Sequence, residues 1–218
     1  MKTSELFLES LAIRDKLIMQ KNFIENKIDS ALLPVLPFRI TDKIKLIIIG
    51  QDPTVKNAES RKKIEYTLNL DKKGSLKKYI SDICTQLGIE FENVYATNIF
   101  KYFYSVPPES TMHVLIQHLE PNLELLKKEL AIYPKQPIIT LGLPVLQLLT
   151  NDKTQVRDFW GYDLKTKQKG KDYCYCRAES NKLNRDIFSF PHQPSIIKKY
   201  YASNINGYIE FMKTKCKF

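Results

Sequence analysis

The sequence lacks the features that mark disulfide-rich, metal-binding, membrane-spanning and repetitive proteins. Its four cysteines are too few in 218 residues to indicate a disulfide framework. Cys174 and Cys176 have no second Cys or His pair at zinc-binding spacing, so we expect packing residues there, no metal and no cofactor. No apolar run is long enough to cross a bilayer, and there are no repeats, low-complexity tracts or linkers.

What remains fits one α/β domain. Hydrophobic residues make up 43% of the chain, which excludes a disordered protein. We predict a single domain over residues 1–218, with a helical extension at 1–40 and the core at 41–218. The N-terminus carries an early acid, Glu5, and no small-residue cleavage site, so we expect no signal peptide. We also expect a cytoplasmic location and a monomer.

The chain has few acids for its number of bases. Its formal net charge of +10 favours a polyanionic partner, because Lys and Arg displace counterions from phosphates, although solubility alone would also account for it. Residues 56–78 hold eight basic and three acidic residues, so this segment carries +5 of the +10. It follows directly after a polar loop at residues 50–53, where it favours an anionic ligand.

That polar loop follows the clearest strand of the sequence. Leu46–Ile49 is a short apolar run rich in β-branched residues, which is typical of a strand buried on both faces of a parallel sheet. Gly50 ends the run, and Gln51 and Asp52 follow it. Ligands of open α/β sheets bind at the carboxyl ends of the strands, so these side chains are candidates for chemistry. The alternative is an ordinary turn, because Asp-Pro is a common turn pair.

Three further strands are predicted at residues 94–97, 137–141 and 187–190, and they end at Asn98, Gly142 and the segment of His192. An amide such as Asn98 can recognise the edge of a base with one donor and one acceptor, although a lone Asn is more often a turn former. His192 lies between two prolines that fix the local backbone. His113 and His118 fall in a predicted helix, and we interpret them as surface or packing residues.

The helices expected between these strands complete an α/β pattern. We predict helices at residues 4–27, at 75–88 with Ser75 as N-cap, at 144–149 and at 203–215, and two helices within 107–132 separated at Pro121. The start of the helix at Ser75, among lysines, could also bind phosphate, and a simple cap is about equally consistent with the sequence. Residues 157–180 are predicted to be irregular or an edge hairpin.

Four motifs, in order, resemble the uracil-DNA glycosylase superfamily, most closely its family 1, with divergent motifs over roughly residues 40–200. The matching segments are Gly50-Gln51-Asp52-Pro53, Gly74-Ser75-Leu76-Lys77-Lys78, Asn98 and, more loosely, His192-Gln193-Pro194-Ser195-Ile196. The resemblance implies a three-layer α/β/α fold around a central, mainly parallel four-stranded sheet. It also implies that the chain acts on DNA.

The resemblance further implies a role for each matching residue. Asp52 would hold the attacking water and stabilise a cationic sugar, and His192 would donate a hydrogen bond to the departing base. Asn98 would distinguish uracil from cytosine. The remaining expected base contacts are Gln51, Thr54 and Leu68, and the expected DNA contacts are Ser75, Lys77, Lys78, Ser195, Ile196 and Lys198. Among these, Ile196 would fill the gap that the everted base leaves.

Two departures from family 1 concern the choice of base. Thr54 replaces a Tyr that blocks the methyl group of thymine, and Leu68, with Tyr66 nearby, replaces a Phe that stacks on the base. The iron–sulfur branch of the superfamily is disfavoured because no cysteine precedes Cys84. The leading hypothesis is a DNA glycosylase that excises uracil or a related base. The alternatives are a non-catalytic nucleic-acid-binding protein of the same fold and an α/β enzyme that acts on free nucleosides or nucleotides.

Overall fold

The computed structural model describes residues 2–20, 26–107, 112–150 and 153–218. Its centre is a five-stranded sheet with the spatial order β1-β3-β2-β4-β5. The strands are β1 (Phe38–Arg39), β2 (Leu46–Gly50), β3 (Val94–Asn98), β4 (Ile138–Leu141) and β5 (Ile187–Phe190). β2, β3, β4 and β5 are parallel to one another, and β1 pairs antiparallel with β3 at the edge.

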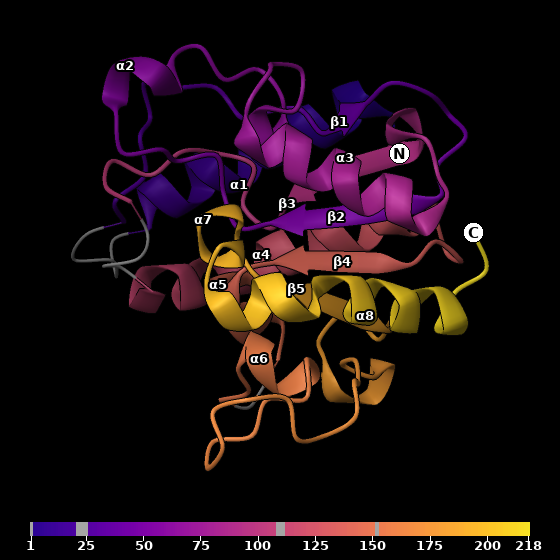
Figure 1. Cartoon of the computed structure of the whole chain (residues 1–218). Helices are drawn as coiled ribbons and strands as arrows, with labels where there is room; N and C mark the ends of the chain where they lie inside the picture. The colour runs from indigo at the N-terminus through magenta and orange to yellow at the C-terminus, as the bar shows by residue number, and fades with distance from the viewer. Residues whose placement is uncertain (1, 21–25, 108–111, 151–152) are drawn as a thin grey trace.

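The four parallel strands form because apolar side chains on both of their faces are covered. Every residue of β2, β3, β4 and β5 is buried, and the four apolar residues of β2 are 0% exposed. Continuous apolar runs of this kind suit a sheet with a helical layer on each side. The predicted three-layer α/β/α architecture is confirmed (Figure 1).

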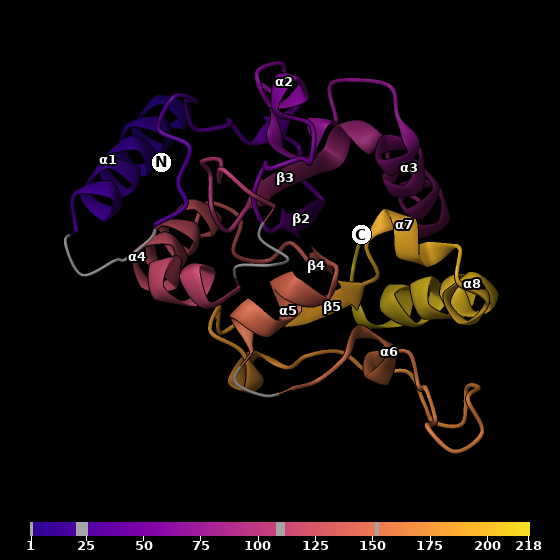
Figure 2. The same ribbon diagram turned by 90° about the vertical axis from the view of Figure 1, so that its left-hand side faces the viewer.

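Helices cover both faces of this sheet (Figure 2). One layer contains α1 (Thr3–Met19), α4 (Met112–Leu130) and α5 (Leu143–Leu149), and the other contains α3 (Ser75–Leu87) and α8 (Lys199–Lys215). The shorter helices are α2 (Ala58–Arg61), α6 (Val156–Phe159) and α7 (Gln193–Ile196), with 3₁₀ turns η1 (Thr67–Asn69), η2 (Phe91–Asn93) and η4 (Ala178–Ser180). None of the helices in the described part of the chain is both long and apolar enough to span a membrane.

Several predicted elements differ from the structure. The sheet has a fifth strand, β1, which is only two residues long and follows Pro37, so its sequence gave no periodic signal. Helix α1 ends at Met19 rather than near residue 27, and residues 21–25 of that prediction lie outside the described residues. The prediction of two helices within 107–132 is wrong, although residues 108–111 of that range lie outside the described residues.

Pro121 lies inside α4 without ending it. A proline removes the donor for the carbonyl four residues earlier, and here that residue is Gln117, which is exposed. Buried leucines on both sides of the proline, Leu119 and Leu123, anchor the two parts of α4 in the hydrophobic core. Tertiary packing therefore outweighs the local preference of proline.

Helix α3 ends where the sequence predicts, but its N-cap is a different residue from the predicted one. It ends at Gly88, whose left-handed conformation lets its N–H bond to the carbonyls of Cys84 and Thr85. Ser75 is not the N-cap, because Gly74 takes that place and no side chain caps the helix. Ser75 is therefore an exposed residue of the first turn, and its hydroxyl is not committed to a cap.

Candidate active site

The ends of the four parallel strands bring the predicted residues to one edge of the sheet. Gly50 is opposite Asn98 across β2 and β3, and Leu141 is opposite Phe190 across β4 and β5. Asp52, Asn98 and His192 follow or end these strands, so all three lie along the carboxyl edge, which faces the viewer in Figure 2. This is the edge where ligands of open α/β sheets bind.

Gly50 lets two other side chains approach the end of β2. A Cβ atom at Gly50 would lie 2.3 Å from Asn98 Oδ1 and 2.8 Å from Leu68 Cδ2. No other residue type fits there without moving the amide. Leu68 has a left-handed backbone, with φ 58°, which is strained for a leucine. Leu68 and Asn98 thereby approach each other at the end of β2, directly before Gln51. That these three residues contact a base stays a prediction.

The amide of Asn98 is buried and makes no hydrogen bond. The residue is 0% exposed, and neither Oδ1 nor Nδ2 has a partner among the described residues. Nε2 of Gln51 is likewise buried and without a partner in that part of the chain. Burying such groups without partners costs about 1–3 kcal/mol each, so a ligand with matching donors and acceptors would relieve this cost.

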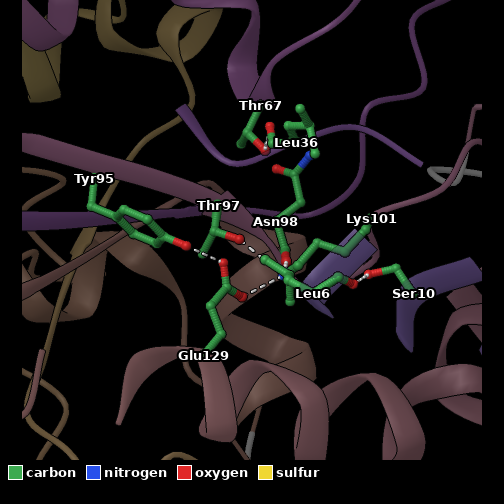
Figure 3. A network of polar contacts seen from close by, with 9 residues as sticks. All are labelled: Leu6, Ser10, Leu36, Thr67, Tyr95, Thr97, Asn98, Lys101 and Glu129. Carbon is green, nitrogen blue, oxygen red and sulfur yellow. Dashed lines mark hydrogen bonds and ion pairs between the residues drawn. The ribbon is translucent and has the colours of Figure 1, made fainter. Parts of the chain in front are cut away.

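A buried ion pair holds the backbone of Asn98 (Figure 3). Lys101 Nζ donates to the carbonyl of Asn98 at 2.6 Å and to Thr97 Oγ1 at 2.9 Å. The same ammonium lies 2.7 Å from the carboxylate of Glu129, which also accepts a hydrogen bond from Tyr95. Lys101 and Glu129 are 2% and 1% exposed, so α4 is tied to the end of β3 through charges that water does not reach.

Asp52 is held by Thr54 and, through it, by the loop after β3. The backbone N–H of Thr54 donates to Asp52 Oδ1 at 2.8 Å, and its hydroxyl also bonds to this carboxylate. The N–H of Tyr104 donates to Thr54 Oγ1 at 2.8 Å. The hydroxyl of Thr54 is therefore already engaged by Asp52 and Tyr104, and does not extend toward a base as a tyrosine would.

Arg61 closes the same loop from the other side. Its guanidinium donates to the carbonyls of Val55, Tyr104 and Ser105 at 2.7–3.0 Å, and the residue is 5% exposed. Burial raises the pKa of Asp52 from its ordinary value of 3.8 to about 7, while hydrogen bonds from Thr54 and the charge of Arg61 lower it. The carboxylate is thus poised to change its charge near neutral pH.

His192 stands at the other end of this edge. The residue is exposed, and its Cβ would lie 3.3 Å from a Cβ at Gly142, whose φ of +89° favours glycine. Tyr79 of α3 donates to the carbonyl of the preceding Pro191 at 3.3 Å and so fixes the start of this loop. Because β4 lies between β2 and β5, the two strands that lead to Asp52 and His192 are about 10 Å apart, roughly the span of a nucleoside.

The predicted DNA-contacting residues surround the same edge with different exposures. Ser75, Lys78 and Lys198 are exposed, and Ser195 is half-buried. The ammonium of Lys77 lies over the ring of Phe91, 5.1 Å from its centroid, so an aromatic ring already contacts this charge. Ile196 packs partly against the core, whereas the next residue, Ile197, is 78% exposed.

His118 and the aromatic residues after β3 are packing residues, as the sequence suggests. His118 is 0% exposed, and its Nδ1 lies 3.1 Å from the hydroxyl of Tyr104. Burial lowers the pKa of His118 from 6.5 to about 4, so the ring is neutral at pH 7. His113 is exposed on the same helix.

Sequence reasoning missed three buried charged residues that support the site. Lys101 is an isolated cation in an otherwise apolar and aromatic stretch, and Glu129 falls on the helix face of Leu126 and Leu130. The sequence could have indicated these two residues, because a charged side chain on an apolar face needs a partner of opposite charge when it is buried. Arg61 carried none, since it lies among exposed lysines.

Residues 37–211 match the sequence profile of the uracil DNA glycosylase superfamily. The chain belongs to this superfamily. The match covers most of the chain, including all the site residues described above, and confirms the resemblance at that level. Closeness to family 1 stays a prediction. No curated protein shows significant similarity to the chain.

Within residues 2–20, 26–107, 112–150 and 153–218, no three His, Cys, Asp or Glu side chains come together in a way that could hold a metal ion. The candidate site consists of the carboxylate of Asp52, the amide of Asn98 and the imidazole of His192.

Proposed function

We propose that the protein is a DNA glycosylase that everts uracil or a related altered base and hydrolyses its N-glycosidic bond. The observation that carries this proposal is the amide of Asn98, buried at a strand end with two atoms that bond to no described residue. The edge of a pyrimidine offers the donors and acceptors that such an amide lacks. Membership of the uracil DNA glycosylase superfamily supports the same reaction class.

The proposed reaction assigns one task to each side chain. As the bond between C1′ and the base breaks, its electron pair leaves with the base and positive charge develops on the sugar. Ionised Asp52 stabilises that charge and takes a proton from the water that attacks C1′. His192 donates a hydrogen bond to the base oxygen, where negative charge develops. Asn98 and Gln51 orient the base, and Lys101 with Glu129 keeps Asn98 in place.

The choice of base depends on Thr54 and Leu68. Because the hydroxyl of Thr54 is engaged by Asp52 and Tyr104, only its methyl group remains to face the base. We therefore propose that thymine is not excluded at this position in the way that family 1 excludes it. Leu68 Cδ2 would lie 2.8 Å from a Cβ at Gly50, so we propose that this apolar side chain borders the base.

A panel of oligonucleotides tests this function. Each duplex carries one altered pyrimidine or purine, and alkali after incubation reveals abasic sites. We expect cleavage at uracil and none in a matched duplex that contains neither uracil nor thymine; a third duplex with a single thymine tests whether Thr54 admits that base. If every strand stays intact across deaminated and oxidised bases, at pH values on both sides of 7, the glycosylase proposal is wrong.

A second candidate, a non-catalytic nucleic-acid-binding protein, is favoured by the position of Leu68. Leu68 Cδ2 would lie 2.8 Å from a Cβ at Gly50, and Asn98 Oδ1 is close to the same point. In this second function, Leu68 would block the entry of a base there. This function predicts DNA binding that weakens with salt and no release of base. Release of free base from a mononucleotide would instead indicate an enzyme that acts on nucleosides or nucleotides.

A further inference from the structure

We infer that residues 161–171 form an arm that contacts phosphates of the nucleic acid flanking the candidate active site. This segment, the lysine hairpin, carries lysines at alternate positions: Lys165, Lys167, Lys169 and Lys171. All four are exposed, and none takes part in an ion pair among the described residues. Figures 1 and 2 show the segment standing out from the body of the protein below α6.

The lysine hairpin has a defined backbone. Tyr162 and Lys169 form an antiparallel bridge, and the N–H groups of Gly170 and Lys171 both donate to the carbonyl of Gly161. At the tip, the carboxylate of Asp163 accepts hydrogen bonds from the N–H groups of Lys165 and Thr166. The hairpin therefore presents its lysines from a hydrogen-bonded scaffold.

The only acid within the lysine hairpin is used by the turn itself. The two N–H donors to Asp163 hold the pKa of its carboxyl below the ordinary value, so it is ionised at neutral pH. One carboxylate thus stands against four ammonium groups. The ammonium of Lys169 lies over the ring of Tyr173, 4.5 Å from its centroid, and the charge of Lys171 acts on Asp163. Lys165 and Lys167 at the tip therefore carry the charge that is open to a polyanion.

The foot of the lysine hairpin packs against α8, the helix that follows the loop of His192 and α7. The ring of Tyr162 packs edge-on against Tyr200 of α8, with centroids 4.7 Å apart, and the hydroxyl of Tyr200 donates to the carbonyl of Trp160 at 2.7 Å. Helix α8 begins at Lys199, directly after α7 and the loop of His192. A strand bound across the carboxyl edge would therefore run past α7 toward the lysine hairpin.

The dimensions match a nucleic acid better than a small anion. An extended arm of about five residues reaches on the order of 15 Å, and one DNA strand carries a charge about every 3.4 Å along the axis. The lysine hairpin can therefore contact several phosphates outside the everted nucleotide. Its partner is inferred as nucleic acid because of the neighbouring site, so this inference rests on the proposed function.

The test compares two double variants that remove the same charge from different places. Lys165→Gln with Lys167→Gln alters the tip of the hairpin. The matched control, Lys43→Gln with Lys45→Gln, removes two exposed alternate lysines before β2, at the opposite end of the strands. Equal thermal unfolding temperatures of both variants and the wild type exclude folding defects.

Binding to a 30-base-pair duplex with one uracil is measured by fluorescence anisotropy at several salt concentrations, beside binding to a five-nucleotide strand. We expect the hairpin variant to lower the slope of log Kd against log salt by about 2 on the duplex, because each phosphate contact adds about 0.9. The short strand should bind unchanged. The control should lower the slope by less than 1.

Two results would overturn the inference. The first is an unchanged slope on the duplex in the hairpin variant. The second is a hairpin variant that loses binding to anionic phospholipid vesicles while duplex binding stays the same. Base excision by the wild type is scored separately, so failure of the glycosylase proposal and failure of the hairpin inference give different results.

Discussion

Asp52 combines two properties that oppose each other, because it is half-buried, which favours the neutral form, and yet must be ionised to stabilise a cation. Its pKa of about 7 expresses that conflict. Because this folded-state value lies above the ordinary 3.8, the folded protein binds more protons between pH 4 and 7, and the free energy of unfolding falls as pH rises through this range. Ionised Asp52 thus lowers the free energy of unfolding at neutral and alkaline pH.

Replacing Asp52 with Asn should therefore stabilise the protein at alkaline pH. We expect Asp52→Asn to raise the free energy of unfolding by up to about 4 kcal/mol at pH 8 and to have little effect near pH 4. Urea denaturation at the two pH values measures this difference. A variant that is less stable than the wild type at pH 8 would show that the carboxylate is not penalised by burial.

Thr54 offers a second prediction at the scale of a residue. Thr54→Val removes the hydroxyl that bonds to Asp52 and accepts from Tyr104, so we expect a loss of about 1–3 kcal/mol of stability. Because a hydrogen bond that lowers the pKa of Asp52 disappears, the pH at which excision reaches half its maximum should also rise. The kcat should fall more than KM rises.

Thr54→Ser is the matched control, since it keeps the hydroxyl and removes only the methyl group. We expect its pH profile to follow that of the wild type. If serine shifts the profile as far as valine does, packing of the methyl group rather than hydrogen bonding positions Asp52.

At the scale of an element, the end of β3 depends on α4 through the pair of Lys101 and Glu129. Lys101→Met leaves a carboxylate buried without its partner, which typically costs about 3–5 kcal/mol. The double variant Lys101→Met with Glu129→Leu should lose less, because no charge remains buried. Urea denaturation of the two variants measures the coupling.

An exposed pair serves as the control for that prediction. Lys62 and Glu59 form an ion pair with exposed side chains in α2 and its cap, and Lys62→Met should cost about 0–1 kcal/mol. If Lys101→Met costs no more than this control, the buried pair does not hold the end of β3.

Helix α7 presents two adjacent isoleucines with different surroundings. Ile197 is 78% exposed, and Ile196 packs partly against the core. We expect Ile197→Ala to leave the unfolding temperature unchanged and to slow excision from duplex DNA more than from a single strand, because an exposed apolar side chain can fill the gap in the stack. Ile196→Ala should lower the unfolding temperature.

The opposite pattern, with Ile196→Ala selectively slowing excision from duplex DNA, would assign the gap-filling role to Ile196, as the resemblance implies. Equal effects on duplex and single strand in both variants would argue against any such role for α7.

The sequence predicted most of the elements that place the site. The apolar run of β2 and the ends of β3 and β5 were identifiable, because strands buried on both faces leave continuous apolar signals. The two-residue strand β1 and the uninterrupted helix α4 were not, because the first is too short for a pattern and the second depends on packing around Pro121. The N-cap of α3 was misassigned by one residue, as helix ends often are.

The polar residues of the candidate site could be predicted from the sequence, but the hydrogen bonds that hold them in place could not. Asp52, Asn98 and His192 stand at strand ends, where the sequence alone gives their position. The bond from Tyr104 to Thr54 and the contacts of Arg61 with the carbonyls of Tyr104 and Ser105 join segments about 40 to 50 residues apart in the chain, so no local pattern reveals them.

At the scale of the whole molecule, the positive charge is not evenly spread. Residues 56–78 flank the candidate site on one side of the carboxyl edge, and the lysine hairpin stands on the opposite side, below α8 and α6 in Figure 2. Arg61 is buried and Lys77 contacts Phe91, so the exposed lysines between and around them carry the charge available to a phosphate backbone. The molecule therefore offers basic groups on two sides of one buried amide.

The central claim is that Asp52 and Asn98 act together on one everted base, and its most direct test is the single-turnover rate of uracil excision by Asp52→Asn. We predict a rate at least about 10²-fold below that of the wild type at pH 8, with binding to the same duplex retained. A variant that excises uracil as fast as the wild type would contradict the account.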